Sequence, residues 1–146
     1  MVELVVVIVI LGILAAVAAP RFFDDRAFLE RGYYEELAAA LKYAQKLAVA
    51  SGCPVRVAIA ANGYDARQQA AAGTTCNLGD TTWPTAVQLA DGRVLSGTTP
   101  VGVSASPAVT LVYDSLGRTN LAADQVVSVG AFALTVRADS GYVQAP

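Results

Sequence analysis

The chain opens with an apolar segment that shows neither helical nor strand-like alternation. Residues 4–20 contain no charged side chain, and Glu3 is the single charge before them. A helix that is apolar on every side must be buried all round, in protein or in lipid. As a helix, residues 4–19 extend over about 24 Å, slightly less than the roughly 30 Å hydrocarbon core of a bilayer.

Two other interpretations of this segment are a helix inside a soluble core and the apolar region of a secretory signal peptide. A signal peptide has a basic start and a small-residue cleavage site. Here Glu3 is acidic, and the apolar run continues directly into a further helical pattern. We therefore expect residues 1–20 to form a hydrophobic transmembrane helix.

The pattern becomes amphipathic after Pro20. Apolar side chains recur every three or four residues and predict one packed face, which contains Tyr34, Leu37, Leu41, Ala44 and Ala48. Gly52 followed by Pro54 predicts the end of the helix. A proline inside a helix removes one hydrogen bond and clashes with the preceding turn. We therefore expect one long helix, kinked at Pro20, with an amphipathic half at residues 21–51.

Residues 52–146 predict a β-rich globular head. Val55, Val57 and Ile59 alternate with less apolar residues, and Asn62-Gly63 after them is a strong hairpin signal. Further strand candidates are residues 101–103, 109–113 and 126–129, with a last hairpin formed by residues 131–137 and 142–144. We expect residues 68–82 to form a loop and Asp91-Gly92 to form a turn. An α+β fold follows, in which one sheet face covers the packed face of the helix.

Composition supports the same boundary near residue 51. All four glutamates and both lysines lie within the first 46 residues, whereas every threonine lies after residue 73. Glutamate and lysine favour helices, and threonine favours strands. The 146 residues suffice for one domain with an extension. A 55% hydrophobic and 15% charged composition excludes a disordered chain.

The residue types also restrict the chemistry. The chain has no histidine and two cysteines, which excludes Ser-His-Asp catalysis and a four-cysteine zinc site. Asp114 and Asp124 are a candidate carboxylate pair, but Asp114 lies in a turn before Gly117, where Asx-type hydrogen bonds are common. We expect no enzyme, no catalytic residue, no cofactor and no metal site.

Binding of nucleic acid is not expected either, because phosphate contacts require clustered basic side chains. The head has five arginines and six aspartates. Trp83 and the tyrosines can stack on a sugar, although Trp83 before Pro84 is equally typical of a core anchor.

The two cysteines, Cys53 and Cys76, lie in segments predicted to be irregular. In the cytosol they would be ordinary free thiols. In an oxidising compartment, a cysteine pair at this spacing is suited to a disulfide that would fix the long loop to the end of the helix. We predict a disulfide between Cys53 and Cys76.

The N-terminal motif resembles a known family. Val2-Glu3-Leu4 before an uninterrupted apolar run, then Leu11-Gly12-Ile13-Leu14-Ala15 and Ala18-Ala19-Pro20, is similar to the N-terminal helix of type IV pilins and type II secretion pseudopilins. Residues 43–48 and 111–118 resemble the minor pilin and minor pseudopilin branch. Residues 21–24 and 51–55 most resemble minor pilins of mannose-sensitive haemagglutinin pili.

The resemblance implies specific roles for the N-terminal residues. Glu3 would set subunit registry by neutralising the N-terminal amine of an adjacent subunit. Gly12 and Pro20 are the positions where we expect the helix to kink or unwind. Family members are made with a basic leader that a prepilin peptidase removes. No such leader or Phe-Thr pair precedes Met1, which stands where the family usually has leucine.

The function implied is that of a minor structural subunit of a type IV pilus, with a role in assembly, initiation or at the tip. The alternatives are a minor pseudopilin of type II secretion and a ligand-binding adhesin or DNA-capture pilin. Partners would be other subunits, through the N-terminal helix, and an inner-membrane assembly platform. The chain would cross the bacterial inner membrane once, with a periplasmic head, before entering the filament.

Overall fold

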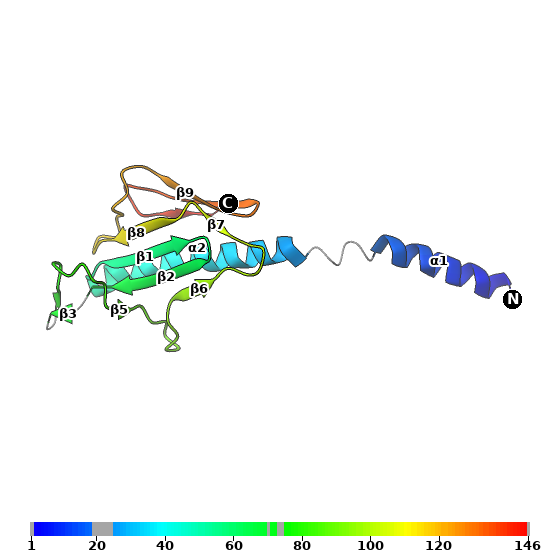
Figure 1. Cartoon of the computed structure of the whole chain (residues 1–146), viewed down its shortest axis with the longest axis horizontal. Coiled ribbons are helices and arrows are strands. Elements are labelled where there is room, and N and C mark those ends of the chain that lie inside the picture. Colours follow the sequence, from blue (N-terminus) through cyan, green and yellow to red (C-terminus); the bar gives the residue numbers. More distant parts are fainter. Residues whose placement is uncertain (1, 19–24, 70, 73–74, 146) are drawn as a thin grey trace.

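The computed structural model describes residues 2–18, 25–69, 71–72 and 75–145. It has an α+β fold in which a long helix, α2, packs against antiparallel sheets (Figure 1). The helices are α1 (Val2–Ala18) and α2 (Asp25–Ser51). The strands are β1 (Val55–Ala60), β2 (Gly63–Gln68), β3 (Ala71–Ala72), β4 (Thr75–Cys76), β5 (Thr85–Ala86), β6 (Ser96–Thr98), β7 (Ala105–Ser106), β8 (Val109–Tyr113), β9 (Gln125–Val129), β10 (Phe132–Val136) and β11 (Val143–Gln144).

The packed face of α2 is the one that the apolar spacing predicts. Tyr34, Leu37, Leu41, Ala44 and Ala48 are each no more than 2% exposed, and α2 ends at Ser51, just before Gly52. The predicted kink at Pro20 lies outside the described residues. The helical pattern on either side of it is present as α1 and α2.

The first sheet contains five strands in the order β5-β2-β1-β8, with β6 also paired to β2. The β1–β2 hairpin is confirmed, but its two-residue loop is Ala61-Asn62, one position earlier than the Asn62-Gly63 signal suggests, because Ala60 pairs with Gly63. Gly63 belongs to β2, where a Cβ would overlap the carbonyl oxygen of Gly97 on β6. The glycine thus permits a close strand contact rather than the turn itself.

The expectation of a single covering sheet is wrong. A second sheet has the order β11-β10-β9-β7, and β3 pairs with β4 in a separate small hairpin. Both larger sheets contact α2. Each presents alternate apolar side chains to a shared core, for example Val57 from β1 and Leu134 from β10, both fully buried.

Two local predictions fail for identifiable reasons. Residues 101–103 form a turn in which the Val103 N–H donates to the Pro100 carbonyl at 3.0 Å, and Val101 is 98% exposed. Pro100 and Gly102 favour that turn over a strand. The predicted loop at residues 68–82 contains β3 and β4. Strands β5, β6 and β7 were not predicted, because each is two or three residues long and too short to show alternation.

Gly141 occupies a position where a side chain would meet backbone. Its φ is 67°, and an added Cβ would overlap the carbonyl oxygen of Gly117. We expect Gly141→Ala to lower the free energy of unfolding by about 2–4 kcal/mol, since left-handed strain and a steric overlap add together. Chemical denaturation measures this loss.

Gly92 is the matched control for this prediction. Its φ is 83°, but an added Cβ there would meet nothing within 4 Å. Gly92→Ala should therefore show the backbone strain alone, about 1–2 kcal/mol. Equal losses in the two variants would contradict a steric role for Gly141.

Four buried tyrosines make the head sensitive to alkali. Burial, with a smaller contribution from Glu36, raises the pKa of Tyr33 to about 12, and burial also raises the pKa of Tyr34, Tyr64 and Tyr113. Because these pKa values are higher in the folded than in the unfolded chain, their stabilising effect is present below about pH 10 and is lost as the pH rises further. We therefore expect the midpoint of chemical denaturation to fall as the pH is raised above about 10.

Tyr113→Phe tests the cause of that alkaline loss. The Tyr113 hydroxyl is buried and has no hydrogen-bond partner among the described residues. Removing it should cost little stability at neutral pH and should make the alkaline loss smaller. An unchanged alkaline loss in Tyr113→Phe would show that ionisation of this tyrosine does not contribute.

Candidate assembly site

The surface of α1 is apolar on every side and is not covered by the head. Eleven large apolar side chains of α1 are between 50% and 77% exposed: those of Val2, residues 4–11, Ile13 and Leu14. Consecutive helical residues point in directions about 100° apart, so exposure of residues 4–11 leaves no face of the helix buried. Soluble proteins rarely expose apolar patches of this extent, which usually mark membrane or protein contacts.

Glu3 lies in the first turn of α1, between Val2 and Leu4. It is the only charged residue in this helix, and no ion pair between described residues includes it. A carboxylate at a helix N-terminus interacts favourably with the helix dipole. If this end is buried in an apolar phase, the carboxylate also needs a cation from outside the helix.

Helix α1 runs through Gly12 without interruption, and an added Cβ at Gly12 would meet nothing within 4 Å. Unwinding at Gly12 in lipid or in an assembly therefore stays a prediction, and Pro20 lies outside the described residues. No helix in the described ranges combines the length with the apolar character of a membrane-spanning helix.

Polar contacts from α2 attach it to loops of both sheets. The Glu30 carboxylate accepts a hydrogen bond from the Ala131 N–H in the β9–β10 turn at 3.2 Å, and Arg26 lies 3.3 Å from it. The Gln45 amide donates at 2.9 Å to the carbonyls of Gly117 and Ser140. In the part of the chain that the structure describes, these contacts fix α2 to the head, while the large apolar side chains of α1 are exposed.

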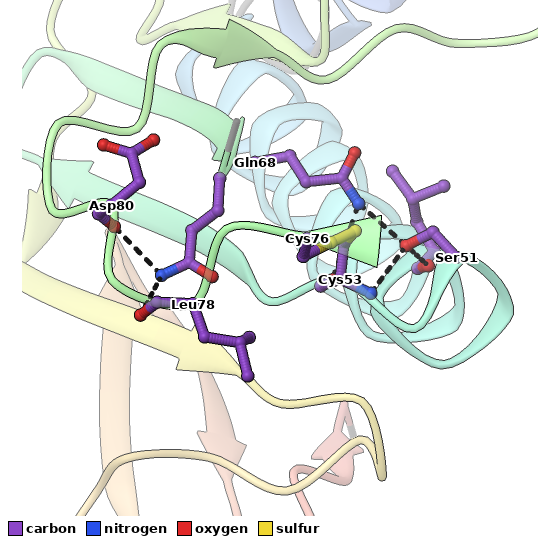
Figure 2. Close-up of a disulfide and its surroundings, with 8 residues drawn as sticks. Ser51, Cys53, Gln68, Cys76, Leu78 and Asp80 are labelled. Atoms are coloured by element: carbon purple, nitrogen blue, oxygen red, sulfur yellow. Dashed lines mark hydrogen bonds between the residues drawn. A yellow bond between two sulfur atoms is a disulfide. The ribbon is translucent and has the colours of Figure 1, made fainter. Parts of the chain in front are cut away.

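A disulfide joins Cys53 and Cys76 and connects the end of α2 to β4 (Figure 2). The surrounding contacts are polar: the Cys53 N–H donates to the Ser51 hydroxyl at 3.2 Å, and the Gln68 amide donates to the same hydroxyl at 2.7 Å. The buried Gln69 amide donates to the Asp80 carbonyl at 3.0 Å. These contacts position the segment that leads from β2 to β5.

Loss of the disulfide should destabilise the head. The two cysteines are 23 residues apart, and closing a loop of that length stabilises a fold by about 3–4 kcal/mol in the chain-entropy treatment. We expect reductant to lower the free energy of unfolding by that amount, measured by urea denaturation. The double variant Cys53→Ser, Cys76→Ser should not respond to reductant. Alkylation of both thiols in unreduced protein would contradict the bond.

The candidate carboxylate pair does not form a site. Asp114 accepts hydrogen bonds from the Leu116 and Arg118 N–H groups at 2.9 Å, which confirms the predicted Asx turn, and pairs with the Arg118 side chain. Asp124 instead pairs with Arg137. The described residues contain no cluster of three potential metal ligands.

Trp83 is neither a core anchor nor fully exposed. It is half-buried, and the Arg56 guanidinium lies 5.5 Å from its ring centre. The sequence analysis did not single out Arg56, which sits on the outward side of β1. The Asn62-Gly63 signal would have placed Arg56 opposite Gln69, whereas the observed loop, one position earlier, pairs Arg56 with Arg67.

One comparison with known proteins gives a match. A family model described as "Type II transport protein GspH" matches residues 34–144, which cover α2 from its first buried positions and nearly all of the head. No curated protein and no solved structure matches the chain.

Proposed function

Because this chain belongs to the GspH family of type II transport proteins, we propose that it is a minor pseudopilin, a structural subunit of a type II secretion filament. The observation that carries this proposal is the fully apolar, exposed surface of α1 beside a head whose core does not use it. Such a helix can reside in lipid and later exchange lipid for the helices of neighbouring subunits. In this proposal the chain has a structural role, and the assembly machinery supplies the work of moving it from the membrane into the filament.

The proposed location follows from the three segments of the chain. Residues 1–20 would anchor the chain in the inner membrane and would later lie in the filament core. Residues 21–51, the amphipathic half of the helix, would connect this segment to the head. Residues 52–146 would form the head in the periplasm. The disulfide between Cys53 and Cys76 supports the periplasmic side, since disulfides persist in oxidising compartments. A prepilin peptidase and an inner-membrane assembly platform would be its processing and assembly partners.

A minor subunit of a type IV pilus is the second candidate. It is favoured by the resemblance of residues 21–24 and 51–55 to minor pilins of mannose-sensitive haemagglutinin pili. Neighbouring genes for secretion or for pilus components would give a first indication of which filament this chain serves.

The decisive experiment is to follow the tagged precursor in a host that assembles both filaments. We expect the chain to co-isolate with the major pseudopilin in sheared filaments and to disappear from them when that subunit is deleted. Co-isolation with the major pilin alone would favour the second candidate. Absence from both filaments, with both assembled, would overturn the structural role.

A further inference from the structure

One arginine of the head differs from the others in its partners. Four head arginines each pair with an aspartate: Arg67 with Asp65, Arg93 with Asp91, Arg118 with Asp114, and Arg137 with Asp124. Arg56 forms no salt bridge with any residue that the structure describes. Arg56 is therefore the one head arginine that forms no ion pair with the residues that the structure describes.

The position of Arg56 places its charge opposite a second arginine, Arg67, which is itself paired with Asp65. In the β1–β2 register Arg56 lies directly opposite Arg67, and on its other side it faces Val112 of β8. Like charges directly opposite each other on neighbouring strands destabilise a sheet, but the Asp65 carboxylate that pairs with Arg67 offsets part of this repulsion. Packing does not require the residue either, because Arg56 alternates with the buried Val55 and Val57 and lies on the outward face.

Trp83 holds the Arg56 guanidinium on this face. The guanidinium carbon lies 5.5 Å from the ring centre, within the range of a cation–π contact. Trp83 has a φ of 53°, which is rare and strained for a bulky residue. The segment before it is fixed by the Asp80 carboxylate, which accepts the Thr82 N–H at 2.8 Å, and by the Gln69 contact to the Asp80 carbonyl.

The arrangement suits one kind of ligand group. A guanidinium stacked on an aromatic ring keeps its N–H edge available for a bidentate contact with a carboxylate. Arg67 is already paired with Asp65, so Arg56 alone is left to pair with a single carboxylate from outside the chain. Polyphosphate chains are disfavoured because the head has five arginines against six aspartates.

We infer that Arg56 and Trp83 form a docking site for a glutamate or aspartate side chain of a partner protein. Ala58 and Ala60 continue the same face of β1 and line a hollow of about 260 Å³, which does not include Arg56 or Trp83. Asp65, which pairs with Arg67, also lines this hollow, so the flanking part of the partner peptide that lies there would be uncharged. This inference does not depend on which filament the chain enters, nor on assembly itself.

The single tryptophan of the chain makes the test site-specific. Full-length protein in neutral detergent micelles is titrated with a capped oligoglutamate peptide while Trp83 fluorescence is recorded. We expect a saturable change that weakens with added salt and does not occur with a capped oligoglutamine peptide. A DNA oligonucleotide in a third titration should produce no saturable change.

Variants separate recognition by Arg56 from general charge. Arg56→Gln should weaken oligoglutamate binding by about tenfold or more, because a charge-assisted hydrogen-bond pair is lost. Arg56→Lys keeps the charge but loses the planar fork, and should also weaken binding. Arg93→Gln, which alters a salt-bridged arginine elsewhere on the head, should bind as the unaltered protein does.

Three results would overturn the inference. They are no saturable change with oligoglutamate, equal binding by Arg56→Gln and the unaltered protein, and preferential binding of the oligonucleotide. Because none of these titrations involves a filament, failure here would leave the proposed structural function unaffected.

Discussion

Deletion of residues 1–21 should give a soluble, folded, largely monomeric head, whereas we expect the full chain to require detergent. The deletion removes eleven exposed large apolar side chains of α1, each worth about 1.5–3 kcal/mol when transferred out of water. It removes none of the buried core, whose first residue along the chain is Tyr33. Size-exclusion chromatography without detergent, together with circular dichroism, measures both consequences.

The control for this deletion is the full chain in the same detergent. Its thermal unfolding should match that of the truncated head, because the core and the disulfide are common to both. A full chain that is monomeric in plain buffer, or a truncated head that aggregates, would contradict the idea that α1 needs a covering phase.

Substitution of Glu3 should block assembly while leaving membrane insertion intact. In a membrane or filament core, a carboxylate is tolerated only when a cation meets it. Helix α1 contains no basic residue, so we predict that the cation is the N-terminal ammonium of a neighbouring subunit. Glu3→Ala or Glu3→Gln would leave that ammonium unpaired.

An uncompensated buried charge costs about 3–5 kcal/mol, which corresponds to at least about a hundredfold loss of incorporation. The measurement is the ratio of variant in sheared filaments to variant in the inner membrane. Leu4→Ala is the matched control, since it removes one of eleven exposed apolar side chains and no charge. Equal incorporation of Glu3→Ala and the unaltered chain would mean that Glu3 has no part in assembly.

The two predictions test different properties of the same helix. Removal of α1 examines its apolar surface as a whole, whereas the Glu3 substitution examines one charge within it. A helix that serves only as a membrane anchor would require the exposed apolar surface but not the Glu3 carboxylate. We predict that a filament subunit requires both the apolar surface and the Glu3 charge, because pairing of that charge would define where each subunit stops along its neighbour.

Short-range patterns in the sequence were sufficient for several elements. The spacing of Leu37, Leu41 and Ala44 identified the buried face of α2, and the alternation in residues 55–59 identified β1. The last hairpin, β10 and β11, also lies where residues 131–137 and 142–144 predicted it. These features depend on which side chains avoid water within one helix or strand, and periodicity reports that directly.

Pairing over long distances was decided only by the tertiary structure. The division into two sheets, and the short strands β5, β6 and β7, depend on contacts between segments far apart in the chain. The same holds for the Gln45 amide, which bridges loops near residues 117 and 140. Two or three residues carry too little periodicity to show their pairing, and turn residues do not identify the strand that closes a sheet.

The candidate functional residues likewise divide into those that the sequence indicates and those that only the tertiary structure brings together. The sequence alone predicted that α1 is covered by lipid or protein and showed that Glu3 is the one charge within it, because both follow from composition along a single helix. Only the tertiary structure brought Trp83 against Arg56 and separated Asp114 from Asp124 into different ion pairs. The physical reason is that side-chain partners on a sheet are set by register and loop path, which local sequence does not specify.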